Sequence, residues 1–151
     1  MNNKTWAAAF LFAAVAMSAC AVEGEAGMIK NSSGDVSIVR SGTRIPGAVG
    51  TPVFAADKVR TGADGSVGMT LRDSTLLSAG PNSLVVLDRF VFYSTTNAGT
   101  LSVSVKKGTL AVATGKIAKE TPESIDFRTS TAVIGVRGTE FVIDAGAGND
   151  D

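Results

Sequence analysis

Apolar and polar residues alternate one by one along much of the chain beyond residue 34. In residues 67–72, Val-Gly-Met-Thr-Leu-Arg, the large apolar side chains fall on one face and the small or polar ones on the other. A period of two is that of a half-buried β-strand. The same alternation, or a short run rich in β-branched residues, predicts further strands at residues 36–40, 83–87, 101–105, 109–113, 125–129 and 131–143.

Turn-forming residues separate these strands. Clusters of glycine, aspartate, serine and asparagine, together with a Lys-Lys-Gly sequence, predict turns at residues 34–35, 63–65, 73–75, 95–99 and 106–108. The charged pair Asp88-Arg89 is predicted to end the strand that begins at residue 83. Proline cannot donate a hydrogen bond to a strand ladder, so residues 45–52, with two prolines, are predicted to form a loop or an edge.

Two stretches have a different character. Residues 90–93, Phe-Val-Phe-Tyr, are apolar on both faces, which predicts a buried segment. Residues 115–123 carry two lysines and two glutamates around Pro122, which predicts an exposed loop.

No stretch of the chain shows a sustained helical period. Strand signals recur at intervals of about 8–12 residues, which is typical of sandwiches, barrels and strand solenoids. We therefore predict a single small all-β domain over residues 34–144, built as a strand solenoid or a sandwich with Greek-key-like connections. A length of 151 residues suits one domain of this kind.

The amino terminus has the pattern of an export signal. Lys4 is followed by a short apolar run over residues 6–16 and then by small residues before Cys20. The run is too short to span a bilayer, which needs about 20 residues. Residues 1–19 are therefore predicted to be a signal peptide, residues 20–33 a small, polar tether, and residues 145–151 a flexible acidic tail.

The sequence Ser18-Ala19-Cys20 resembles the lipobox of bacterial lipoproteins. In that class the cysteine thiol receives a diacylglycerol, the signal is cut before the cysteine and the new amino terminus is acylated. The resemblance implies that Cys20 is a lipid attachment site. Ala21 after it implies an outer membrane location facing the periplasm rather than the inner membrane. A plain signal peptide with a chance cysteine is the alternative.

Composition excludes several classes of protein. Fourteen basic and fourteen acidic residues balance, so no strong field attracts nucleic acid. The chain has no histidine and a single cysteine, which removes Ser-His-Asp and Cys-His catalysis, ordinary zinc sites and an internal disulfide. The acidic residues are spread singly, beside turns or basic residues, as in Asp57-Lys58 and Arg72-Asp73. We therefore predict turn and surface roles for them rather than catalysis by an enzyme acting on polysaccharide. We expect no catalysis, no cofactor and no metal.

Residues 129–141, Thr-Ser-Thr-Ala-Val-Ile-Gly-Val-Arg-Gly-Thr-Glu-Phe, resemble the FecR domain family, as does the stretch at residues 57–62. The resemblance covers residues 30–144, with Ser130 in place of the usual proline and Ser74 in place of a glycine. It implies an exported module that senses a ligand or a protein. The best-known members are periplasmic halves of transmembrane regulators that relay iron-receptor occupancy to a sigma factor. No membrane helix or anti-sigma segment precedes the domain here, so we expect that role not to carry over.

The most distinctive polar group lies within this motif: Arg137, Gly138, Thr139 and Glu140. These residues could grip a partner, or they could form a structural motif in which glycines turn the chain and the charged residues make ion pairs; we favour the structural interpretation. The predicted function is a lipid-anchored protein-interaction or sensing module in the cell envelope, whose partners are the membrane and an unknown envelope protein. The alternatives are a structural or peptidoglycan-associated protein and, less favoured, a regulator of an iron-uptake sigma factor.

Overall fold

In the computed structural model of the chain, residues 24–136 and 139–147 are described. They form one small all-β domain with a single short α-helix, which confirms the predicted fold class. The elements in chain order are β1 (Gly27–Ser33), β2 (Val36–Arg40), β3 (Thr43–Pro46), β4 (Pro52–Val53), β5 (Lys58–Thr61), β6 (Ser66–Leu71), β7 (Leu76–Ala79), β8 (Leu84–Phe92), β9 (Gly99–Ala113), α1 (Lys116–Glu120), the 3-10 turn η1 (Pro122–Ser124), β10 (Ile125–Arg128), β11 (Val133–Gly135) and β12 (Glu140–Gly146).

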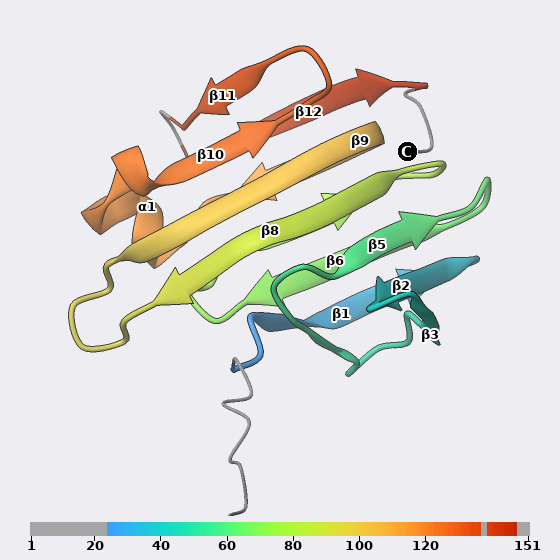
Figure 1. The fold of residues 1–151 in the computed structure, drawn as a ribbon, viewed down its shortest axis with the longest axis horizontal. Helices are drawn as coiled ribbons and strands as arrows, with labels where there is room; N and C mark the ends of the chain where they lie inside the picture. Colours follow the sequence, from blue (N-terminus) through green and yellow to red (C-terminus); the bar gives the residue numbers. More distant parts are fainter. Residues whose placement is uncertain (1–23, 137–138, 148–151) are drawn as a thin grey trace, which may run out of the picture.

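The strands belong to one curled sheet that folds over on itself (Figure 1). Its order is β3-β2-β5-β8-β9-β7-β6-β1-β4. The long strand β9 is the fold line, since its first part pairs with β8 and β10 and its last part with β7 and β12. The two halves of the sheet thus face each other as two layers, which we call layer B (β3, β2, β5, β8, the start of β9, β10, β11) and layer A (the end of β9, β12, β7, β6, β1, β4).

The chain passes between the layers at a stack of corners along one side. The Gly62 N–H donates to the Asp35 carbonyl, and the Asn82 N–H donates to the Gly62 carbonyl. The Thr109 N–H then donates to Ser83 Oγ. Each corner is therefore hydrogen-bonded to the next, from the β1–β2 turn across to the bend in β9.

Glycine allows these corners to lie in contact. A Cβ at Gly108 would stand 2.1 Å from Ser83 Oγ, and a Cβ at Gly65 would stand 2.3 Å from the Asp35 carbonyl oxygen. Both distances are far below van der Waals contact, so a larger residue would force the stacked corners apart.

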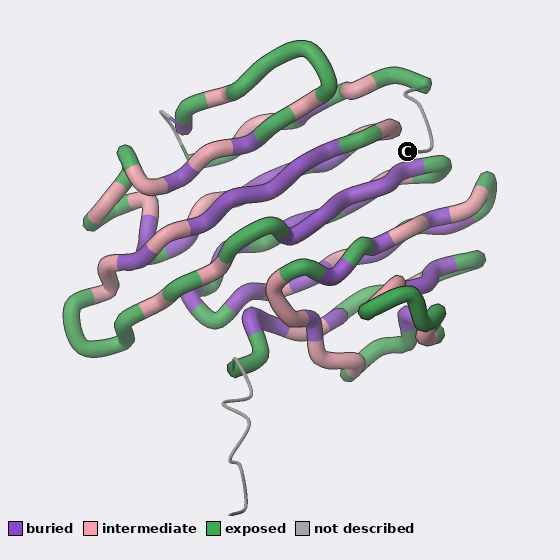
Figure 2. The backbone as a smooth tube through the Cα atoms, viewed as in Figure 1, coloured by how far each residue is buried: buried purple, intermediate pink, exposed green. Residues whose placement is uncertain are grey.

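The core lies between the two layers. Alternation in β6, with Val67, Met69 and Leu71 buried, confirms the predicted period of two. Purple in Figure 2 marks continuous burial along the first half of β8 and most of the first half of β9. Phe127 of layer B is fully buried and meets Phe141 of layer A edge-to-face, with ring centroids 5.1 Å apart. The two layers therefore share one hydrophobic core.

The predicted tether over residues 20–33 is wrong in its second half. Residues Gly27–Ser33 form strand β1, which pairs with β6 and β4. Ile29 is fully buried, and Ala26 just ahead of β1 is 1% exposed. Strand β1 has one large apolar side chain that is fully buried, so its sequence shows little alternation. Only its pairing with neighbouring strands identifies it as a strand. The domain therefore begins before residue 34. The predicted tail also shortens, since β12 continues to Gly146.

Three further predictions need correction. Residues 106–108 are a bend within continuous β9 rather than a turn between two strands. Residues Asp88 and Arg89 form a bulge inside β8 rather than its end. Residues 90–93 are not buried as a unit, because β8 ends at the rim of the sheet, where Val91 is 37% and Tyr93 61% exposed.

The predicted loop at residues 115–123 contains helix α1 and the turn η1. Ile117 is the buried residue of α1 and anchors it against the core. A helix of about one and a half turns is too short to show a helical period in sequence, so tertiary packing decides it. The proline-rich stretch behaves as predicted, since β3 and β4 lie at the ends of the sheet order.

Candidate functional site

The structure describes some, but not all, of the residues that the sequence pointed to as possible site residues. Cys20, Arg137 and Gly138 lie outside the described residues. Thr139 lies just ahead of β12, and its carbonyl oxygen accepts a hydrogen bond from the Thr114 N–H at 2.8 Å. Glu140 is exposed and lies opposite Ala113 of β9. The described part of the motif therefore attaches β12 to the end of β9.

Strand β12 forms one side of a shallow groove on the outer face of layer A. Two cross-strand rows build its floor and walls, because residues directly opposite each other in a sheet point to the same side. One row joins Leu76, Ala113 and Glu140. The other joins Ser78, Ala111 and Val142.

Side-chain size gives the groove its shape. The alanines of β9 are small, whereas Leu76 on β7 and Val142 on β12 stand up on either side. These two side chains are 47% and 70% exposed. The hollow has a volume of about 390 Å³ and is lined mainly by apolar surface. Such an exposed apolar surface is typical of an interaction site.

The outer margin of the groove is the edge of a sheet. Among the described strands, β12 pairs with β9 alone, so no described strand covers its other side. Glu140, Val142 and Asp144 alternate on the outward face and are all exposed. The edge therefore presents an apolar centre between two carboxylates.

The groove has a rigid support. Beneath it, Leu77, Val112 and Ile143 point into the core and are at most 4% exposed. Phe141, between Glu140 and Val142, packs its ring against Phe127 of the other layer. A site on packed strands keeps its shape better than a site on a loop.

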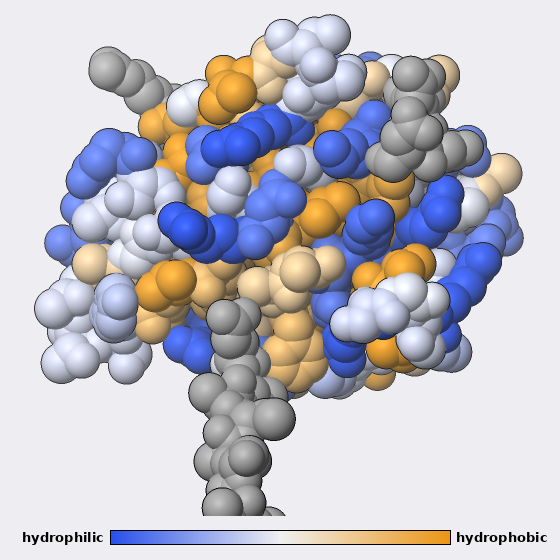
Figure 3. Space-filling model, viewed as in Figure 1, coloured by the Kyte–Doolittle hydropathy of each residue, from blue (hydrophilic) through white to orange (hydrophobic). Residues whose placement is uncertain are grey.

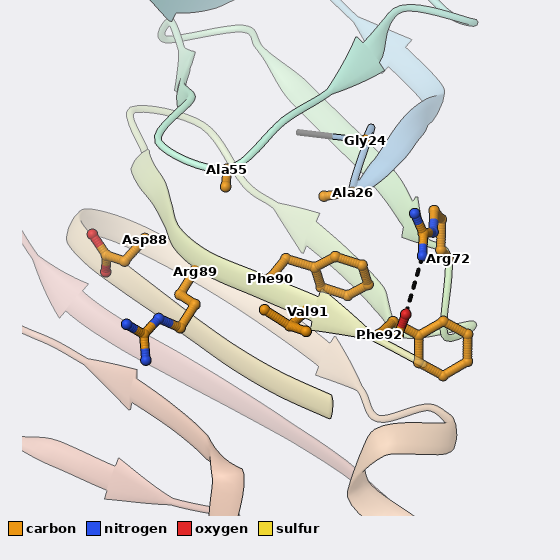
Figure 4. A pocket seen from close by; sticks show the side chains of 9 residues that line it. All are labelled: Gly24, Ala26, Ala55, Arg72, Asp88, Arg89, Phe90, Val91 and Phe92. Atoms are coloured by element: carbon orange, nitrogen blue, oxygen red, sulfur yellow. Dashed lines mark hydrogen bonds between the residues drawn. The ribbon is translucent and has the colours of Figure 1, made fainter. Parts of the chain in front are cut away.

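A second hollow lies at the rim where β8 ends (Figure 4). Its volume is about 400 Å³, and its walls include Arg72, Arg89, Phe90 and Gly24. The Arg72 guanidinium donates to the Phe92 carbonyl at 3.2 Å and lies 6.0 Å from the centre of the Phe90 ring. Figure 4 shows Asp88 and Arg89 at the opposite end from Arg72. The arginine nearest the aromatic rings is thus tied to the rim of the sheet.

The buried carboxylates hold the fold together. Asp57 is 1% exposed and accepts from Arg40 Nε at 2.9 Å and from Arg40 Nη2 at 2.7 Å. Asp73 is fully buried and accepts from the Thr75 hydroxyl at 2.7 Å. The turn role predicted for Asp73 agrees with this geometry, whereas the surface role predicted for Asp57 beside Lys58 is wrong, because its partner is Arg40.

No cluster of three or more potential metal-ligating side chains occurs among residues 24–136 and 139–147. Within the same residues, no helix has both the length and the apolar character that crossing a bilayer requires.

Comparison with known proteins identifies the family. The family model described as FecR protein matches residues 57–150, which is more than half of the chain. The chain belongs to the FecR family. No curated protein and no solved structure matches it. The FecR family is associated with the cell envelope and with sensing and regulation there, so this FecR chain carries a domain of that envelope-associated type.

Sequence reasoning missed the groove of this FecR domain. Its signals were present in the alternation of Ala111 and Ala113 with larger residues and in the adjacent Leu76-Leu77 pair. In that pair Leu77 is buried and Leu76 exposed. Only the register of β7, β9 and β12 brings the small and large residues together on one face.

Proposed function

We propose that this FecR protein is a non-catalytic protein-interaction module of the cell envelope, and that its interaction site is the groove and open edge of β12. The observation that carries the proposal is the coincidence of an exposed apolar surface with an uncovered strand edge. The 70% exposure of Val142 at the middle of that edge is the clearest sign of it. The FecR family's association with envelope sensing supports the same role.

The geometry favours an extended segment of another envelope protein as the partner. A strand added beside β12 would use the backbone groups of the sheet edge for affinity and side-chain hollows for specificity. Alternate side chains of that segment would stand on the outer face beside Val142, and long ones would reach over it toward the alanines of β9. Since Glu140 and Asp144 flank Val142, the segment would have an apolar centre and basic residues on either side.

We further propose that the protein is anchored by acyl chains on Cys20 in the outer membrane, facing the periplasm. The support is the sequence Ser18-Ala19-Cys20 followed by Ala21. Two or more acyl chains give stable anchoring, whereas one gives only marginal binding. The described domain starts within a few residues of Cys20, so its interaction site would stay close to the membrane surface.

Site-specific photocrosslinking in living cells tests the interaction site. A photoreactive amino acid is placed at Val142 and, in a control, at Val49, which is similarly exposed at 63% but lies in the loop before β4. We expect a discrete crosslinked envelope protein from position 142 and none from position 49. The crosslinked peptide should map to an extended, basic and apolar segment.

A groove variant makes the test specific. Ala111→Lys fills the groove from its outer face without entering the core, and we expect it to lower the crosslinking yield at position 142 by roughly tenfold, the effect of about 1.4 kcal/mol. Equal crosslinking from positions 142 and 49, or a yield unchanged by Ala111→Lys, would contradict the proposal. Recovery of the protein with purified peptidoglycan and with no crosslinked protein would favour the structural alternative.

A further inference from the structure

Strand β12 is the most accessible edge of the sheet. Among the described strands, four have a neighbour on one side only: β3, β4, β11 and β12. Strands β3 and β4 contain Pro46 and Pro52, and β11 is only three residues long. Proline and short length are common ways of protecting an edge from further pairing. Strand β12 has seven residues and no proline, so it can accept another strand.

The hydrogen-bond ladder determines which backbone groups of β12 face outward. The Thr114 N–H donates to the Thr139 carbonyl, so this pair occupies a hydrogen-bonded position between β9 and β12. Such positions alternate along an antiparallel pair of strands. Phe141 therefore bonds to β9 as Thr139 does. The backbone N–H and C=O groups that point away from β9 belong to the residues at the positions between: Glu140, Val142 and Asp144.

The same three residues are exposed on the outward face of the sheet. Neither the Glu140 nor the Asp144 carboxylate makes an ion pair within the described structure. Asp144 Oδ1 accepts a hydrogen bond from the Gly146 N–H at 2.8 Å, which holds that carboxylate at the end of the strand. A strand that bonds to the backbone of these residues therefore also meets their side chains, with two unpaired negative charges on either side of Val142.

We propose that Glu140 and Asp144 select which strands can pair with this edge. The inference rests on the proposed interaction site and adds the direction and register of the partner. In an antiparallel pair centred opposite Val142, the partner residues two places before and after the centre lie opposite the two carboxylates. Opposite charges at such positions stabilise a pair of strands, and like charges destabilise it. The edge thus accepts an antiparallel segment with an apolar centre and a basic residue two places to either side.

The same rule keeps two copies of this chain apart. In a symmetric antiparallel pair centred on Val142, Glu140 of each copy lies opposite Asp144 of the other, because both are two residues from the centre. Carboxylates then face carboxylates at both positions. An open edge without such charges is a template for self-association. On the face seen in Figure 3, hydrophilic residues are interleaved with hydrophobic ones, which also opposes a broad apolar contact between copies.

Copies of the chain with exchanged charges test the inference without a known partner. Glu140→Lys places a cation opposite Asp144 of a second copy, so this variant should self-associate roughly tenfold more tightly than the unaltered protein, since two repulsive cross-strand pairs become attractive. The double variant Glu140→Lys with Asp144→Lys should bind the unaltered protein but not itself. Sedimentation velocity measures each case at low salt, in non-ionic detergent with micelles in large excess over protein. Salt at about 1 M should remove the differences by screening the exposed charges.

Matched controls assign the effect to β12 and to an antiparallel pair. Glu123→Lys makes the same charge change at an exposed residue of η1 and should behave as the unaltered protein does. A parallel pair would set position 140 of one copy against position 140 of the other, so Glu140→Lys alone would gain nothing. Circular dichroism checks folding. Glu140→Lys also leaves the hydrogen bond from Gly146 to Asp144 in place, so it tests the proposal independently of the double variant.

Three results would overturn the proposal: Glu140→Lys associating no more tightly than the unaltered protein, Glu123→Lys associating equally well, or the double variant binding itself as tightly as it binds the unaltered protein. Any of these, together with a discrete crosslinked protein from position 142 in cells, would remove the charge rule and leave the proposed function standing. Loss of the crosslink with the expected pattern of association would do the reverse.

Discussion

At the scale of single residues, the clearest structural interaction is the ion pair of half-buried Arg40 with buried Asp57. Both nitrogens of the Arg40 fork that face the carboxylate donate to it, and the Phe54 N–H donates to the same carboxylate at 2.9 Å. The hydrogen bond to Asp57 raises the pKa of Arg40 above its usual value, although burial acts to lower that pKa. Because the pKa of this base is higher in the folded chain, the pair stabilises the fold at every pH below the ordinary pKa of arginine. This stabilisation is lost only as the pH rises through the raised pKa of Arg40.

Asp57→Asn should lower the free energy of unfolding by about 2–3 kcal/mol. Removing one partner of a fully buried ion pair leaves the other charge uncompensated and costs about 3–5 kcal/mol. The loss expected here is smaller, because the Arg40 side chain is 33% exposed. Urea unfolding followed by circular dichroism measures the change. Arg44→Gln, which breaks an exposed pair, is the control and should change stability by less than about 0.5 kcal/mol. Equal effects of the two substitutions would show that burial of Asp57 does not matter.

Particular residues also show which features the sequence alone predicts and which it does not. The motif at residues 129–141 identified the family correctly. It could not show that Glu140 lies beside the exposed Val142, because that requires the register of β12 on β9. The partner of Asp57 was missed because Arg40 is seventeen residues away in sequence.

At the scale of elements, β9 decides the architecture. Its first half belongs to layer B and its second half to layer A. The bend between them falls at Gly108, whose φ of +79° is in the left-handed region that favours glycine. A Lys-Lys-Gly sequence resembles a hairpin turn locally. Pairing on both sides of the strand keeps the chain extended instead.

Gly108→Ala should destabilise the protein by about 2–5 kcal/mol. Two effects add: left-handed backbone strain of about 1–2 kcal/mol for a residue with a Cβ, and overpacking against Ser83, which costs about 1–3 kcal/mol. Gly42→Ala is a matched control, since Gly42 has nearly the same φ of +77° and no atom within 4 Å of the place that a Cβ would occupy. It should therefore cost only the strain. Chemical unfolding of both variants measures the difference, and equal losses of stability would contradict close packing at the corners.

At the scale of the whole molecule, the groove and the amino-terminal end of the described chain belong to one domain. The groove lies on the outer face of layer A, and the hollow lined by Gly24 lies at the rim where β8 ends. Because the two layers share one core, the domain holds these surfaces on a single rigid body. The described chain begins near the hollow lined by Gly24, which lies four residues after Cys20 in the sequence.

Cys20→Ala should abolish lipid attachment and release the protein from the membrane fraction. The lone thiol is the acceptor in the proposed anchor, and without acyl chains no other anchor is proposed. Incorporation of a labelled fatty acid precursor, together with membrane fractionation, measures both effects. Ser18→Ala keeps the small residues before the cysteine and should remain labelled. A Cys20→Ala protein that still fractionates with membranes, with neither form labelled, would contradict lipid anchoring.

The sequence by itself determined the fold class and the family. Period-two alternation is a local property that shows which side of a strand is buried, and the stretch from Gly135 to Phe141 is a local motif. The tertiary structure decided which strands are neighbours, that residues 106–108 continue a strand, and that Ile29 and Ile117 are core residues. Each of these depends on contacts between residues distant in the chain. The same contacts create the groove, whose members come from three separate strands.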